Sequence, residues 1–192
     1  LPRVTLAALA ASAATALAAA PLAAAERYVL DPSHSQILFS YDHLGYSTTW
    51  GLFSGFEGEI LFDEADPAAS SVRVAFPVST MLTGWEARYA HFMSADFFGG
   101  DSQVSFVSTA IDVTGADSAH ITGDLTLNGV TQAVVLDARL NAKGDHPMEG
   151  RPWAGFDATT TLARSDFGLG LFAPFVGDEV RVSISIEAMK AD

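Results

Sequence analysis

The sequence has no cysteine among its 192 residues. This absence excludes disulfide bonds, a thiol nucleophile, iron–sulfur clusters and cysteine-ligated zinc. Other signatures of catalysis are missing too: there is no G-x-S-x-G segment, no glycine-rich phosphate loop, and no His-x-His or His-Glu-x-x-His pattern among the five histidines. We therefore expect no enzymatic activity, no metal site and no cofactor.

Basic residues are scarce. Ten Lys and Arg stand against 23 Asp and Glu, which gives a formal net charge of -13 at pH 7. A surface of this sign repels nucleic acid and anionic lipid headgroups, so we expect neither as a surface partner. After residue 25 no uninterrupted apolar run reaches the length of about 18 residues that a transmembrane helix needs, so no stable membrane insertion is expected there.

The first 25 residues differ from the rest of the chain. They are almost entirely Ala and Leu, with Arg3 as their only charge, and three alanines precede Glu26. A basic start, an apolar run and a small-residue cleavage site are the layout of a secretory signal peptide. The sequence thus predicts a signal peptide over 1–25 and one exported domain over 26–192. The alternative, an uncleaved anchor, is disfavoured by the weakly apolar alanines and by Pro21.

Apolar residues alternate with period two through most of the remaining chain. Alternation of this kind is typical of strands with one buried and one solvated face, and Asn128-Gly129 predicts a two-residue hairpin turn of type I′. About eight strands are predicted, near 28–43, 50–63, 71–79, 103–113, 119–128, 131–141, 153–164 and 179–189. A single helix is expected near 84–98. The pattern favours an all-β protein, an antiparallel lipocalin-like barrel with a helical segment capping one end; a β-sandwich would use the same strands.

Aromatic side chains are the candidate interior, since the chain has 13 Phe. A long apolar ligand gains binding energy from buried apolar area, at roughly 25 cal/mol per Å². A tunnel lined by such residues would suit it, although the same residues could fill an ordinary core. The candidate lining residues are Ile37, Phe39, Tyr41, Phe53, Trp85, Phe92, Phe97, Phe106, Phe156, Phe167, Leu169 and Phe172. The segment 167–172 would be either a lip at the tunnel entrance or a plug over one end.

Three basic residues are candidates for a polar headgroup. Arg88 and His91 lie three residues apart on the predicted helix and share a face. The alternative for Arg88 is a salt bridge with a local acid such as Asp96. Arg164 is the third candidate, and its alternative is a structural role, either pairing with Asp166 or fixing the loop after its strand.

Several blocks of the chain, in this order, resemble the YceI family of periplasmic polyisoprenoid-binding proteins. The blocks are DPSHS at 31–35 followed by Ile37 and Phe39, HLG at 43–45, GLFSGFEG at 51–58, RYAHFMSADFF at 88–98, FVS at 106–108, GDLTLNGVT at 123–131, RSDFG at 164–168 and GDEV at 177–180. No single block is diagnostic, but their order and spacing make the match. The resemblance implies a lipocalin-like barrel with an apolar tunnel, a non-covalently bound polyprenyl or isoprenoid-quinone ligand, and a periplasmic location.

Three functions are compared on this basis. The favoured one is a carrier for a long apolar isoprenoid-type lipid. A barrel-based enzyme acting on a lipid or quinone would need a polar pair deep in the tunnel. A stress-related partner-binding protein without lipid cargo would show a large exposed apolar patch and no internal cavity. The sequence also leaves a homodimer open.

Overall fold

The computed structural model describes residues 25–100 and 102–192. The predicted signal peptide therefore lies outside the described residues except for Ala25. The strands are β1 (Glu26–Leu30), β2 (Gln36–His43), β3 (Ser47–Ser54), β4 (Glu57–Phe62), β5 (Ser71–Pro77), β6 (Met81–Leu82), β7 (Gln103–Val113), β8 (Ser118–Leu127), β9 (Val130–Asp145), β10 (Pro152–Ala163) and β11 (Val176–Lys190). One α-helix, α1 (Glu86–Phe92), and three 3₁₀ turns, η1 (Pro67–Ala69), η2 (Val78–Thr80) and η3 (Arg164–Phe167), complete this part of the chain.

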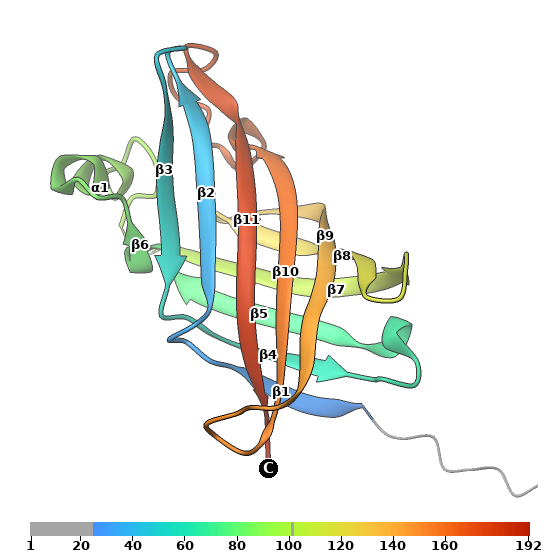
Figure 1. Cartoon of the computed structure of the whole chain (residues 1–192). Coiled ribbons are helices and arrows are strands. Elements are labelled where there is room, and N and C mark those ends of the chain that lie inside the picture. The colour runs from blue at the N-terminus through green and yellow to red at the C-terminus, as the bar shows by residue number, and fades with distance from the viewer. Residues whose placement is uncertain (1–24, 101) are drawn as a thin grey trace, which may run out of the picture.

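The sheet closes on itself. Its order is β1-β4-β5-β7-β8-β9-β10-β11, and β1 pairs back to β11 through Tyr28 and Lys190. Every pairing is antiparallel, so the predicted all-β antiparallel barrel of eight strands is confirmed, together with one short helix (Figure 1). The strands β2, β3 and β6 extend the sheet beyond the closed circuit, with β2 pairing along β11 from Val176 to Ser185.

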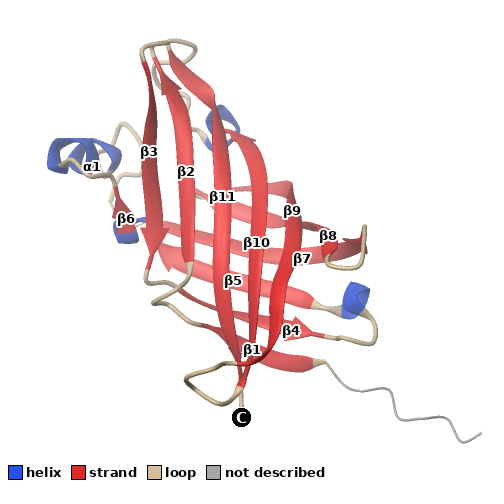
Figure 2. Ribbon diagram, viewed as in Figure 1, coloured by secondary structure: helices blue, strands red, loops and turns tan. Residues whose placement is uncertain are grey.

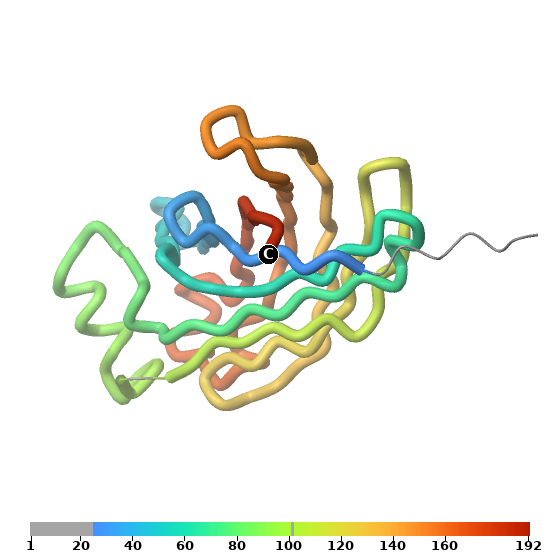
Figure 3. Tube along the Cα trace, turned by 90° about the horizontal axis from the view of Figure 1, so that it is seen from below, coloured from blue at the N-terminus to red at the C-terminus, as the bar shows by residue number. Residues whose placement is uncertain are grey.

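The closed sheet is flattened into two crossing layers. Figures 1 and 2 show β2, β3, β10 and β11 running across the direction of β4, β5, β7 and β8, and Figure 3 shows the same two layers from below. Side chains from the facing surfaces of the two layers meet in the interior, as they do in orthogonally packed sheets. This arrangement leaves a long interior rather than a round one.

The structure divides two of the predicted strands. The range 28–43 breaks into β1 and β2, because the Asp31 carboxylate accepts hydrogen bonds from the backbone N–H of Ser33 at 2.9 Å and bonds His34 Nδ1 at 2.6 Å, closing a turn. The range 50–63 breaks at Gly55, which has a φ of 71° and joins β3 to β4. The helix is also shorter than the predicted 84–98.

The predicted type I′ hairpin is confirmed at residues 128 and 129. Asn128 and Gly129 have φ values of 52° and 74°, and Leu127 pairs with Val130 across the turn. Such positive φ values at both central residues match the right-handed twist of the flanking strands. The turn therefore sets the register of β8 on β9.

A dense core fills the end of the barrel where β1 and β4 close it. Tyr28, Val78 and Ala188 have no exposed surface. The Phe76 ring packs against the rings of Phe53 and Phe56, with centroid distances of 5.1 and 5.0 Å. Such packing supplies most of the apolar stabilisation of a small domain. Among the described residues no helix is both long and apolar enough to cross a membrane.

Candidate ligand-binding cavity

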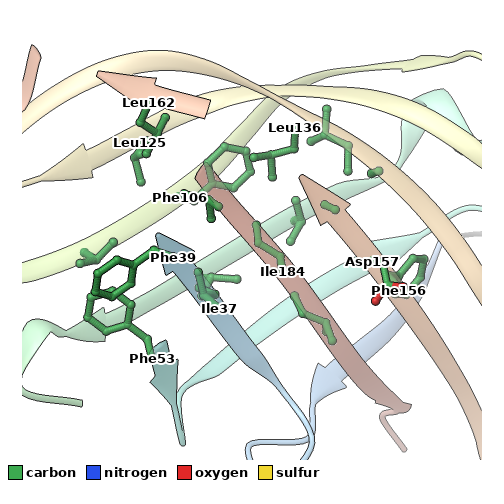
Figure 4. Close-up of a pocket in the computed structure, with 18 of the residues that line it drawn as sticks. Ile37, Phe39, Phe53, Phe106, Leu125, Leu136, Phe156, Asp157, Leu162 and Ile184 are labelled. Carbon is green, nitrogen blue, oxygen red and sulfur yellow. The ribbon is translucent and has the colours of Figure 1, made fainter. Parts of the chain in front are cut away.

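Beyond the packed core the interior is hollow. A cavity of about 380 Å³ lies between the two layers. Figure 4 shows how strands from both layers line it: Ile37 and Phe39 from β2, Phe53 from β3, Phe106 from β7, Leu125 from β8, Leu136 from β9, Phe156 and Leu162 from β10, and Ile184 from β11. The middle of the cavity is therefore an apolar surface built by inward-facing side chains.

The predicted strand periodicity accounts for this lining. On β11, Val180, Val182, Ile184 and Ile186 all face the cavity. Arg181, Ser183 and Ser185 alternate with them and are exposed on the outer face. Glycines make room for large rings: a Cβ on Gly51 would lie 2.3 Å from Cζ of Phe39, so the Phe39 ring can lie flat against β3 only because residue 51 lacks a side chain.

Ten of the twelve predicted lining residues face the cavity. These are Ile37, Phe39, Tyr41, Phe53, Phe92, Phe97, Phe106, Phe156, Phe167 and Leu169. The structure places Trp85 and Phe172 outside the lining, 67% and 52% exposed. Trp85 lies just before α1, whose other end carries Phe92 inward, and the loop backbone at Phe172 has a φ of 67° that turns it outward.

The cavity extends to two ends of the molecule. At one end it reaches α1 and the loop after η3, where Phe92, Phe97 and Leu169 line it. At the other it reaches η1 and the β7–β8 turn, where its lining becomes polar: Ser70, Ser71, Asp117, Ser118, Arg139 and Asp157, which pairs with Arg139 across β9 and β10. The sequence did not predict this second end, because its residues come from turns and from several different strands and share no pattern.

The phenol of Tyr41 is a polar group in the cavity lining at the α1 end. Burial raises the pKa of Tyr41, against smaller opposing effects from Thr49, Arg88 and Arg164. The phenol therefore stays neutral at every physiological pH, as a donor or acceptor of one hydrogen bond. It can meet an uncharged polar group at the end of an otherwise apolar ligand.

The predicted headgroup residues on the helix do not reach the cavity. Arg88 donates from its guanidinium to the backbone carbonyl of Thr83 at 3.0 Å, which ties α1 to the strand before it. His91 Nε2 lies 3.4 Å from a carboxylate oxygen of Asp96. The local acid proposed as a partner for Arg88 is thus next to His91 instead, because helical spacing gives a shared face but not the direction in which it points.

Arg164 lines the cavity at the α1 end, and its side chain is committed elsewhere. It is buried, and its guanidinium donates to the backbone carbonyls of Leu169, Leu171 (2.9 Å), Val176 (2.8 Å) and Gly177 (2.9 Å). Four carbonyl acceptors leave little capacity for a ligand headgroup. The alternative considered for this residue, fixing the loop after its strand, is what the geometry shows.

The chain was compared with known proteins. The YceI-like domain family matches residues 28–188. A UPF0312 protein of Pseudomonas aeruginosa is 38% identical over 188 residues, which cover 97% of this chain and 97% of that protein. A UPF0312 protein of Pseudomonas syringae pv. tomato is 41% identical over 159 residues, or 81% of this chain and 82% of that protein.

Solved structures share the fold. BcnA of Burkholderia cenocepacia superposes with a TM-score of 0.74 at 24% identity, covering 82% of this chain and 98% of that one. For a YCEI protein of Campylobacter jejuni the TM-score is 0.71 at 24% identity, with 79% and 90% covered. A polyisoprenoid binding domain from Saccharophagus degradans gives 0.62 at 14% identity, with 85% and 98% covered. By the family match and by its sequence relatives, the chain belongs to the YceI-like family.

Proposed function

We propose that this chain is a periplasmic carrier that binds a long apolar isoprenoid-type lipid, a polyprenyl chain or an isoprenoid quinone, inside its barrel. The observation that carries the proposal is the apolar cavity that runs between the two layers and reaches two ends of the molecule. The solved Saccharophagus degradans structure of the same fold is described as a polyisoprenoid binding domain, and this supports the choice of ligand class.

The chemistry of the lining fits such a ligand. A prenyl chain offers only methyl groups and double bonds, so its affinity has to come from buried apolar area, at roughly 25 cal/mol per Å² before the costs of association. A cavity of about 380 Å³ falls within the ~300–1,000 Å³ typical of small-molecule sites. Side chains such as Leu125, Leu136 and Ile184 offer contact surface and no hydrogen-bonding group.

The arrangement supports binding over the two alternatives. A barrel-based enzyme would need a polar pair deep in the tunnel. Among the described residues the polar lining side chains are Tyr41 and Arg164 at one end and, at the other, Ser70, Ser71, Asp117, Ser118, Arg139 and Asp157, the cross-strand partner of Arg139. A partner-binding protein without cargo was expected to have no internal cavity. Export to the periplasm rests on the apolar stretch before Glu26, and the mass of protein recovered from that compartment tests it.

Uptake of geranylgeraniol, a C20 prenyl alcohol, tests the proposal. The protein is mixed with the alcohol dispersed in dilute ethanol, freed of excess by gel filtration, and extracted. We expect retention of about one molecule per chain. Leu136→Trp fills the cavity and should lower the affinity at least about tenfold. Val135→Trp is the matched control, because the neighbouring Val135 is half exposed on the outer face and its replacement should change little.

Ile184→Phe provides a second, milder obstruction of the same cavity, in case Leu136→Trp does not fold; circular dichroism establishes folding for each variant. Equal uptake by the inward and outward variants would show that the alcohol binds outside the barrel. No uptake by the wild-type protein, whether or not it had been extracted with solvent first, would overturn the proposal.

A further inference from the structure

One end of the barrel carries a concentration of exposed apolar side chains. The β2–β3 turn contributes Leu44 and Tyr46, and the loop between η3 and β11 contributes Leu171, Phe172 and Phe175; we call these five residues the apolar rim. Tyr46 is 90% exposed and Phe175 is 74% exposed. The two segments lie side by side at the top of Figure 1, joined by a hydrogen bond of 3.1 Å from the Leu44 N–H to the Phe175 carbonyl.

The rim is free of charge in an otherwise acidic chain. Residues 167–176 contain no Asp, Glu, Lys or Arg, and neither do residues 43–56. The nearest charges in sequence are acids: Asp42 before the turn, and Asp166 and Asp178 on either side of the loop. A contiguous exposed apolar surface of this kind marks a site of interaction rather than a solvated loop.

The loop is held in a shape that keeps these side chains outside. The buried Arg164 guanidinium bonds the carbonyls of Leu169, Leu171, Val176 and Gly177. Phe172 has a φ of 67°, a left-handed conformation that is uncommon for a bulky residue. A costly conformation maintained by a buried network is typical of functional segments.

Aromatic rings connect the rim to the cavity. The Phe172 ring lies 6.3 Å from the His91 ring, which lies 5.0 Å from Phe97, centroid to centroid. Phe97 lies 5.6 Å from Phe92, and Phe92 lies 6.4 Å from Tyr41. Phe97, Phe92 and Tyr41 line the cavity. An unbroken series of rings therefore leads from solvent into the interior.

We propose that the apolar rim docks on the surface of a zwitterionic lipid bilayer and that the ligand passes from that bilayer into the cavity along these rings. The inference rests on the proposed function, since a prenyl lipid resides in a bilayer and must leave it without crossing water. Tyr and Phe side chains at uncharged loop tips suit the interfacial layer of a membrane. The flanking acids Asp42, Asp166 and Asp178 oppose anionic headgroups, which is why a zwitterionic surface is specified.

Vesicle flotation tests the docking step. The protein is recovered from the periplasm and its mass is checked, because an uncleaved apolar leader would bind vesicles by itself. Wild-type protein should float with phosphatidylcholine vesicles. Tyr46→Ser combined with Phe175→Ser should weaken this binding at least about tenfold. Met148→Ser is the control, because Met148 is 85% exposed in the β9–β10 loop at the opposite end and its loss should have no effect.

Varying the charge of the lipid headgroups tests whether the flanking acids disfavour anionic membranes. Replacing part of the phosphatidylcholine by phosphatidylglycerol should weaken binding, and added salt should restore it by screening the repulsion. Failure of the wild-type protein to float, or equal flotation of the wild type and the rim variant, would overturn the proposal. In the first case a protein partner for the rim would be the remaining explanation.

Transfer kinetics separate this inference from the proposed function. With geranylgeraniol supplied in phosphatidylcholine vesicles, the rim variant should load at least about tenfold more slowly than the wild type. With the alcohol dispersed in dilute ethanol, both should load equally. Equal loading from vesicles would contradict a role for the rim in transfer. Rim-dependent flotation without uptake from either source would leave the docking surface standing and remove the carrier function.

Discussion

The barrel contains two apolar interiors that the same kinds of strand build in different ways. Around Tyr28, Leu30 and Val78 the side chains fill all space, and their exposed fractions are near zero. Around Leu125, Leu136 and Ile184 the side chains face the cavity. Both regions show the same alternation of apolar and polar residues along the strands. The difference shows that inward-facing residues can either stabilise the fold or form a ligand surface, depending on what lies opposite them.

Closure of the sheet explains where each interior lies. In the packed region β1 bridges β4 and β11 and brings the two layers together. In the hollow region β2 takes the place of β1 beside β11, and β3 and β6 continue the sheet outward. The following substitutions compare the two regions.

Truncation of a large side chain should have the largest effect in the packed region. Leu30→Ala should lower the free energy of unfolding by about 2–5 kcal/mol, because Leu30 is 1% exposed and its truncation opens a new cavity in a close-packed core. Leu136→Ala should cost less than about 2 kcal/mol, because a cavity is already present and few contacts are lost. Urea denaturation measures both, with Leu30→Val as a milder substitute. Equal losses would contradict the distinction between the two regions.

The stability of the hollow region should depend on polar hydrogen bonds, whereas the stability of the packed region depends on apolar contact. Arg164→Ala removes hydrogen bonds from four carbonyls and should lower the free energy of unfolding by about 2–3 kcal/mol. Arg164→Lys keeps the charge without the planar fork, so it should recover only part of this loss. Urea denaturation of the two variants tests this, and a loss below about 0.5 kcal/mol for Arg164→Ala would show that the loop holds its shape without the guanidinium.

Substitution of two glycines by alanine, one in each region, should have smaller effects on the free energy of unfolding. A Cβ on Gly58 would lie 2.7 Å from Cδ1 of Leu30 and 2.9 Å from the Arg73 carbonyl oxygen, inside packed structure that cannot yield. Gly58→Ala should cost about 1–3 kcal/mol. A Cβ on Gly51 meets only the Phe39 ring, which can swing into the cavity. Gly51→Ala should cost under about 1 kcal/mol and reduce geranylgeraniol uptake; the reverse ranking in thermal or urea unfolding would be contrary evidence.

The smallest effect is expected at the turn between β1 and β2. The hydrogen bond to Asp31 raises the pKa of His34 above 6.5, helped by the nearby charges of Asp31 and Glu187. Burial opposes ionisation of Asp31, yet its hydrogen bonds from His34 and Ser33 hold its pKa below 3.8. The His34 contribution to stability is complete below about pH 6.5 and is lost as the pH rises through the raised pKa.

The contribution of the Asp31 carboxylate to stability has the opposite pH dependence and is lost at low pH. The Asp31 contribution is present above about pH 4 and is lost as the pH falls through its lowered pKa. The difference in unfolding free energy between wild type and His34→Gln should therefore be greatest between those limits and shrink from pH 6 toward pH 9. A difference that does not vary over this range would show that the ion pair does not form.

Much of the fold follows from the sequence because periodicity acts locally. The alternation on β11 and the Asn128-Gly129 turn identified the strands, the inward face and one hairpin register. The same alternation placed Phe39, Phe106 and Phe156 in the interior. It could not distinguish a core from a cavity, since that depends on the separation of two layers that are far apart in the sequence.

The predicted site residues that lie away from the cavity do so for equally specific reasons. Trp85 and Phe172 were assigned to the lining, but the rotation of a short helix and the backbone of a loop determine where they point. Arg88 and His91 share a face that turns away from the cavity. The apolar segment at 167–172 was recognised as an entrance or a plug. The hydrogen bond from Leu44 to Phe175, in the same loop, joins segments that lie more than a hundred residues apart and became visible only in the structure.

Native mass spectrometry of the protein from its own compartment, followed by organic extraction, tests the central claim most directly. The account predicts a complex whose excess mass is one apolar molecule, and an extract rich in isoprene units, with the adduct missing from Leu136→Trp and present in Val135→Trp. A protein that is empty as isolated and takes up no geranylgeraniol, or an adduct that Leu136→Trp retains in full, would contradict it.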